Sequence, residues 1–202
     1  MKNRSHIVAG LLLMLFVASG WAHLNLTNTY RVSDLTQMWV EGTSTIHDWE
    51  CSVGRVDGII GMDPDPVNNL AIVSTQITVP VSSLDCDNKT MNKKLAKALK
   101  LDSNPSILFE LETATRSGVG SDLSDQIEAQ GFLMIAGQTR RITLSGITAS
   151  SDGDRMSFSG SAEILMSDFN IKAPTALLGT IKTGDKVTVH FELVLSEDNV
   201  SS

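Results

Sequence analysis

The chain is poor in cysteine, and the spacing of the two that it has excludes several classes of site. Only Cys51 and Cys86 occur among 202 residues, and no C-x-x-C pair is present. A thioredoxin-like redox motif is therefore excluded. Zinc sites need clustered cysteine or histidine ligands, and no histidine pair stands at ligand spacing, so we predict no metal site.

The motifs of common catalytic sites are also missing. The sequence has no glycine-rich phosphate loop and no nucleophile elbow. His47-Asp48 resembles half of a catalytic triad, but adjacent residues of a strand point to opposite faces. His190 alternates with apolar neighbours, and we expect it to face solvent. We predict a binding protein without catalytic residues, and a hydrolase that uses His47 is the least favoured alternative.

No apolar run is long enough for a comfortable transmembrane helix, which needs about 20 residues. The longest run, Ile7 to Ala18, follows Lys2 and Arg4 and precedes the small residues of Gly20-Trp21-Ala22. A basic start, a short apolar stretch and a small-residue exit are typical of a secretory signal peptide. We expect a signal peptide over 1–22 and one domain over 23–202, exported to the periplasm or secreted, without stable membrane insertion after cleavage. An uncleaved anchor is the alternative.

Basic residues are scarce. Without residues 1–22, 14 basic and 23 acidic residues remain, a net charge near −9. This balance argues against nucleic acid or an anionic membrane as the main partner. Five of the 14 stand between Lys89 and Lys100. They favour either a solvated helix face or docking to an anionic partner.

Export and an even number of cysteines together favour a Cys51–Cys86 disulfide. The bond would close a loop of 35 residues and contribute about 3–4 kcal/mol in the chain-entropy model. Two separate buried thiols are the alternative.

Most of the chain shows the period-2 alternation of half-buried strands. We predict strands over residues 28–32, 38–45, 49–62, 71–81, 106–115, 127–136, 142–147, 156–164 and 187–195, with a tight turn at Gly137-Gln138. About eight or nine antiparallel strands pack as a sandwich or close into a barrel. Gly131 and Gly160 on the inward phase indicate either tight packing or room for a ligand.

One stretch breaks the strand pattern. Met91, Leu95, Ala98 and Leu99 form an apolar stripe at helical spacing. Asp87 or Asn88 can cap the helix, and it must end before Asn104-Pro105. We expect Leu95 to be buried, Lys94 to be exposed, and the helix to cover an edge or open end of the sheet.

Six motifs occur in order along the chain. They are Ser44–Trp49, Ser83-Leu84 before the helix, Asn104–Phe109, the alternating glycines and apolar residues of Gly131–Thr139, Met166–Ile171 and Gly184–Val187. In these motifs the chain resembles the YceI-like polyisoprenoid-binding family. The cysteine pair, Asn170 and the Pro174–Gly179 segment depart from the family pattern.

The resemblance implies an all-β fold, a lipocalin-like antiparallel barrel of about eight strands with one short amphipathic helix. It also implies a lumen that holds the tail of an isoprenoid or isoprenoid quinone, with no other cofactor. A prenyl tail needs only a dry apolar tube, because each buried CH2 contributes about 0.8 kcal/mol. The alternative is a filled barrel that acts as a protein-interaction or stress-response module.

Alternation selects the residues expected to touch the tail. The opposite phase carries Glu110, Glu112, Arg155 and Glu192, which could not face a dry tube unpaired. The predicted ligand-binding residues are Phe109, Leu111, Leu133, Ile135, Phe158, Val189 and Phe191. Phe132 and Met134 break the alternation, so the inward assignment of Leu133 and Ile135 has the least support from the sequence.

Overall fold

The computed structural model describes residues 28–63, 71–119, 125–152, 155–176 and 180–197. The expected signal peptide lies outside the described residues. The strands are β1 (Asn28–Val32), β2 (Gln37–Ser44), β3 (Trp49–Val53), β4 (Asp57–Asp63), β5 (Ala71–Pro80), β6 (Leu84–Asp85), β7 (Ser106–Val119), β8 (Asp125–Ile135), β9 (Gln138–Asp152), β10 (Arg155–Leu165), β11 (Thr175–Ala176) and β12 (Ile181–Glu197). The helices are α1 (Lys89–Ala98) and two 3-10 turns, η1 (Val81–Ser83) and η2 (Met166–Phe169). Of the described residues, no helix is both long enough and apolar enough to span a bilayer.

Eight strands close into an antiparallel barrel in the order β1-β4-β5-β7-β8-β9-β10-β12. Closure depends on β1, which pairs with β4 on one side and with the end of β12 on the other. All edges of the closed part are thereby paired, which removes the free strand edges of an open sheet. The barrel prediction is confirmed.

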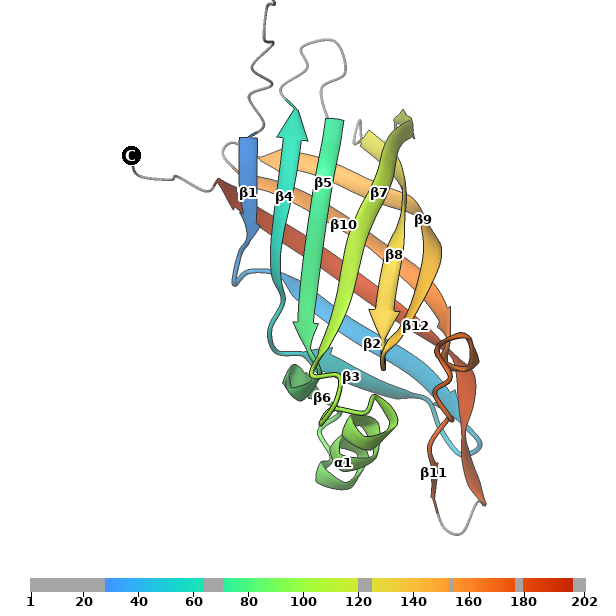
Figure 1. Ribbon diagram of the computed structural model, residues 1–202. Helices are drawn as coiled ribbons and strands as arrows, with labels where there is room; N and C mark the ends of the chain where they lie inside the picture. The colour runs from blue at the N-terminus through green and yellow to red at the C-terminus, as the bar shows by residue number, and fades with distance from the viewer. Residues whose placement is uncertain (1–27, 64–70, 120–124, 153–154, 177–179, 198–202) are drawn as a thin grey trace, which may run out of the picture.

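One edge of β12 pairs with two different strands along its length. Its end pairs with β1 at Val32↔Leu195, whereas its earlier part pairs with β2 from Thr183 to Glu192. β2 pairs with β3, and β3 pairs with β6, so these three strands extend the barrel wall at one end (Figure 1).

The single strand expected over 49–62 is wrong. Two strands, β3 and β4, replace it, because β3 pairs in the extension with β2 and β6, while β4 belongs to the barrel between β1 and β5. Between β3 and β4 the chain leaves the extension and enters the barrel, and Gly54, Arg55 and Val56 make that connection. Gly54, which interrupts the strand pattern, stands at the start of this connection.

The helix α1 covers the same end of the barrel as the extension (Figure 1). Asn88 caps it, since its side chain accepts hydrogen bonds from the backbone N–H groups of Thr90 and Met91 at 2.9 and 3.0 Å. The helix ends at Ala98, ahead of the Asn104-Pro105 pair. Leu99 is buried at 8% exposure, but Leu95 is only half-buried. The expected burial of Leu95 is therefore only partly met, because Leu95 packs against the buried cluster around Leu99 on one side and borders a cavity on the other.

The turn between β8 and β9 is centred one residue earlier than expected. Ala136 and Gly137 have φ values of 52° and 78°, so both central residues are left-handed. Two such residues give a turn whose twist matches the adjoining strands. The carbonyl of Ala136 accepts a hydrogen bond from Nζ of Lys100 at 3.1 Å, which ties the turn to the end of α1.

The inward glycines resolve one alternative left open by the sequence. A Cβ on Gly131 would lie 2.7 Å from Cζ of Phe109, and one on Gly160 would lie 2.9 Å from Cζ of Phe191. The space beside each glycine is therefore taken by an aromatic ring on the neighbouring strand. These glycines permit tight packing, and the open space of the barrel lies elsewhere.

Candidate functional site

The lumen of the barrel contains an inner cavity of about 190 Å³. All seven predicted ligand-binding residues line it: Phe109, Leu111, Leu133, Ile135, Phe158, Val189 and Phe191. They come from β7, β8, β10 and β12, whose inward phases converge on the barrel axis. Among the described residues, Thr75 is the only one in the lining with a polar side chain, so the inner cavity offers almost no hydrogen-bonding groups. Ligand contact at these residues stays a prediction.

The phase of β8, the least certain of the expected phases, is settled by its neighbours. Leu133 lines the inner cavity, whereas Phe132 is 42% exposed on the outer surface. Phe132 pairs laterally with Glu110 and Arg141, which also belong to the outer phase. An apolar side chain on each face hid the alternation of this strand in the sequence.

A second, larger space, the outer cavity, lies beyond the inner one at the end of the barrel that α1 covers. Its volume is about 380 Å³, within the range of sites for small molecules. It is enclosed by α1, the β2–β3 hairpin, η2, β11 and the start of β12. Characteristic lining residues are Trp49, Met91, Leu95, Met166, Pro174 and Ile181.

The two cavities adjoin. Six residues line both of them: Val40, Leu84, Ile107, Ile135, Ile164 and Val189. All six side chains are aliphatic, so the boundary between the cavities is apolar. The result is one apolar path that leads from the middle of the barrel to the end covered by α1.

Apart from Thr75, the polar side chains among the described lining residues belong to the outer cavity. Its lining includes Ser44, His47, Asn88, Thr90, Lys94, Thr175 and Thr183. Of the lining residues that the structure describes, Lys94 is the one with a permanent charge, and its Nζ donates a hydrogen bond to the carbonyl of Thr175 at 2.9 Å. Lys94 is half-buried and not exposed, contrary to expectation. The path thus has a dry inner end and a partly polar outer end.

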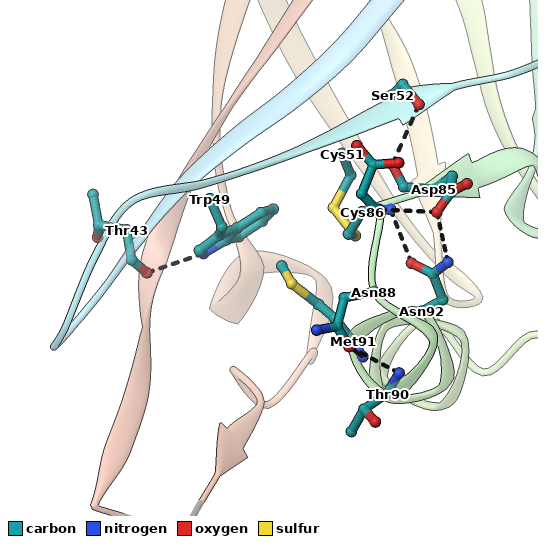
Figure 2. The surroundings of a disulfide bond; sticks show 11 residues. Thr43, Trp49, Cys51, Ser52, Asp85, Cys86, Asn88, Thr90, Met91 and Asn92 are labelled. Carbon is teal, nitrogen blue, oxygen red and sulfur yellow. Dashed lines mark hydrogen bonds between the residues drawn. A yellow bond between two sulfur atoms is a disulfide. The ribbon is translucent and has the colours of Figure 1, made fainter.

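The expected disulfide is present and fixes one wall of the outer cavity. Cys51 in β3 is bonded to Cys86, just before α1, and Cys51 is 1% exposed (Figure 2). The backbone N–H of Cys86 donates to Oδ1 of Asn92 at 2.9 Å, and Nδ2 of Asn92 donates to Oδ1 of Asp85 at 2.7 Å. The bond and this network hold the first turn of α1 against β3, which places Met91 at the cavity.

Trp49 shapes the opposite part of the same wall. Its ring lies over Gly42, where a Cβ would come within 2.2 Å of Cζ2. Its Nε1 donates to the carbonyl of Thr43 at 3.1 Å (Figure 2). Gly42 is therefore required for the indole to lie flat on the β2–β3 hairpin, with its apolar surface toward the cavity.

His47 lines the outer cavity without the contacts of a catalytic base. Its Nδ1 lies 2.7 Å from the backbone carbonyl of Asp48. The hydroxyl of Ser44 donates to the backbone carbonyl of His47 at 2.7 Å, so this serine does not donate to the imidazole. The described geometry gives no support for the hydrolase alternative.

His190 lies on the outer face of the barrel, as expected from its phase. Its ring stacks on Trp39 with a centroid separation of 4.9 Å, and its Nε2 lies 3.2 Å from Glu41 Oε2. The stacked indole leaves the histidine half-buried. Within the described ranges, no three histidine, cysteine or acidic residues are grouped as they would be to hold a metal ion.

Sequence reasoning missed the outer cavity. The apolar stripe of α1 indicated a buried face, but a stripe cannot show whether that face meets packed core or open space. The Pro174 segment was noticed only as unusual, and its place opposite α1 depends on long-range pairing between β11 and β12.

Several solved structures share this fold. BcnA of Burkholderia cenocepacia is 20% identical, with a TM-score of 0.66, covering 81% of this chain and 98% of its own. A polyisoprenoid-binding domain of Saccharophagus degradans, implicated in plant cell wall breakdown, is 10% identical, with a TM-score of 0.64 and coverage of 85% and 99%. The YCEI protein of Campylobacter jejuni is 20% identical, with a TM-score of 0.59 and coverage of 77% and 88%.

The comparison with curated protein sequences gave no match. The family model of the YceI-like domain matches residues 25–195, which is most of the chain and all of the barrel except the last two residues of β12. The closed eight-stranded barrel and the sequence match together show that this chain belongs to the YceI-like family.

Proposed function

We propose that this protein binds a long apolar lipid, such as an isoprenoid or an isoprenoid quinone, with the tail in the inner cavity. The observation that carries the proposal is the apolar path along which the two cavities adjoin. An inner lining in which Thr75 is the only polar side chain among the described residues suits a hydrocarbon chain and offers little to a polar solute. The structurally similar Saccharophagus domain is described as polyisoprenoid-binding.

The polarity of the path also orients the ligand. The tail occupies the inner cavity, where burial of each CH2 contributes about 0.8 kcal/mol. A polar end lies in the outer cavity, where Lys94, Asn88 and Thr90 provide hydrogen-bonding groups. The two spaces argue against the alternative of a filled barrel that acts only as a protein-interaction or stress-response module.

Export to the periplasm or secretion is part of the same proposal. The Cys51–Cys86 bond supports it, because disulfides persist mainly in oxidising compartments. We assign no catalytic residue, and the proposed activity is binding.

The test is chemical extraction of the purified protein. Protein prepared without detergent is extracted with organic solvent, and the extract is analysed by mass spectrometry beside an equal extract of an unrelated exported protein. An apolar lipid close to one per protein, absent from the control, is expected. Extracts indistinguishable from the control, together with no uptake of added polyprenol, would refute lipid binding.

A further inference from the structure

We propose that the α1 end of the barrel docks reversibly on the surface of an anionic lipid bilayer. This rests on the proposed function, since a lipid carrier must exchange a water-insoluble ligand with a membrane. Both α1 and β11 lie at this end (Figure 1), and residues of both line the outer cavity. Docking here would align the apolar path with the bilayer.

The first observation is the charge of α1. The helix carries four lysines and no acidic residue, with the sequence KTMNKKLAKA. Met91 and Leu95 line the outer cavity. Because successive helical residues are separated by about 100°, Lys93 and Lys97 project from the opposite side of α1.

These lysines are available to an outside partner. Lys94 and Lys100 each donate to a carbonyl of the protein itself. Lys89, Lys93 and Lys97 are exposed, and none of the interactions seen among the described residues involves their ammonium groups. Three exposed cations on one short helix match the phosphates of an anionic membrane surface.

The second observation is on the far side of the outer cavity. Lys172 and Lys182 are exposed there, and Lys182 pairs with Thr175 across the β11–β12 ladder. Cations therefore flank the cavity on two separate elements. If the lysines of α1 served only to keep a helix face solvated, a second group of lysines across the cavity would not be needed.

The third observation is Ile46, in the turn between β2 and β3. It is 63% exposed, more than any other large apolar side chain of the described residues, and it also lines the outer cavity. The turn is rigidly held, because the backbone N–H of Thr45 donates to the carbonyl of Lys182 at 3.0 Å. An exposed aliphatic tip beside lysines is the composition of surfaces that lie in the bilayer interface.

The negative net charge of the whole chain does not oppose this contact strongly. The Debye length is about 8 Å at physiological salt, whereas a 17-residue strand such as β12 spans roughly 55 Å. Acidic residues toward the far end of the barrel are therefore screened from a membrane at the α1 end. Exposed acidic residues also lie at the α1 end: Asp48 in the β2–β3 turn, Asp85 and Asp87 before α1, Asp102 after it, and Asp168 in η2. None of them is part of α1, whose lysines share the helix with no acidic residue.

The experiment is cosedimentation with vesicles of phosphatidylcholine, with and without phosphatidylglycerol. The wild type should bind only vesicles that contain phosphatidylglycerol, and about 0.5 M salt should release it. The double variant Lys93→Gln/Lys97→Gln should lose about tenfold or more in partition coefficient. Ile46→Ser should weaken binding severalfold, whereas Leu35→Ser, which alters an exposed leucine in the β1–β2 turn, should not.

The matched control is Arg116→Gln/Arg155→Gln, which removes the same charge from the opposite end of the barrel. If both double variants lose binding equally, net charge and not the α1 face is responsible, and the proposal is overturned. Absence of wild-type binding at low salt overturns it as well, including the case in which α1 serves an acidic protein instead. Lipid extraction from the same Lys93→Gln/Lys97→Gln protein separates the two claims, because its cavity lining is unchanged and its lipid content should equal that of the wild type.

Discussion

Lys94 and Thr175 join the two sides of the outer cavity. Nζ of Lys94 in α1 donates to the backbone carbonyl of Thr175 in β11 at 2.9 Å, and both residues line the cavity. Both α1 and β11 lie outside the closed eight-stranded wall and take no part in closing it. This hydrogen bond therefore spans the place where a ligand would enter.

Removing that bond should affect ligand exchange more than stability. Lys94→Met keeps the apolar stem and removes the donor, so we expect a loss of about 1 kcal/mol or less in the free energy of unfolding. Release of a fluorescent polyprenyl probe to acceptor vesicles should become severalfold faster, as measured by stopped flow. Lys93→Met is the matched control, and equal release rates in the two variants would show that the bond does not retain the ligand.

The two leucines of the helix region should differ in their contributions to stability. Leu99→Ala removes a side chain that is 8% exposed and should cost about 2–4 kcal/mol through lost burial and a new void. Leu95 already borders a cavity, so Leu95→Ala should cost about 1–2 kcal/mol. Urea unfolding of both variants without lipid measures the difference, and the reverse order of losses would contradict the described packing.

The disulfide should stabilise the fold and the outer cavity together. Cys51→Ala/Cys86→Ala should cost about 3–4 kcal/mol in the free energy of unfolding, because the 35-residue loop is no longer closed in the unfolded chain. Chemical denaturation of the two proteins measures this. In the native protein, alkylation without reductant should leave the intact mass unchanged, and addition of two labels would mean that the bond is not formed.

Neighbouring residues of β8 provide a test of the inward phase. Leu133→Glu places a carboxylate in the inner cavity and should abolish lipid co-purification, because no partner there offsets its desolvation. Phe132→Glu changes the adjacent, 42% exposed position and should leave lipid content unchanged. Circular dichroism confirms folding of both variants, and a folded Leu133→Glu protein that keeps its lipid would contradict the assignment.

Local patterns predicted much of this fold. Alternation identified most strands of the barrel, and the stripe from Met91 to Leu99 identified the helix. The expected export, together with the even number of cysteines, predicted the Cys51–Cys86 disulfide. The division of 49–62 into two strands could not be predicted, because it depends on which distant strands each half pairs with. The inward phase of β8 was predicted from alternation, which the apolar Phe132 and Met134 on the other face weaken.

The candidate site was predictable in its inner half only. The residues that face the lumen follow from which face of each barrel strand is apolar, and the sequence shows this residue by residue. The outer cavity is enclosed by α1, the β2–β3 turn and β11, three segments far apart in sequence whose packing is set by the Cys51–Cys86 and Lys94–Thr175 links. A sequence pattern for Leu95 or Pro174 is the same whether the side chain meets another side chain or open space.

Native mass spectrometry of the protein, purified without detergent, tests the central claim most directly. The account predicts a species heavier than the bare chain by the mass of one lipid, which collisional activation releases and which the Leu133→Glu protein lacks. A wild-type spectrum that shows only the bare chain, unchanged after incubation with polyprenol or an isoprenoid quinone, would contradict it.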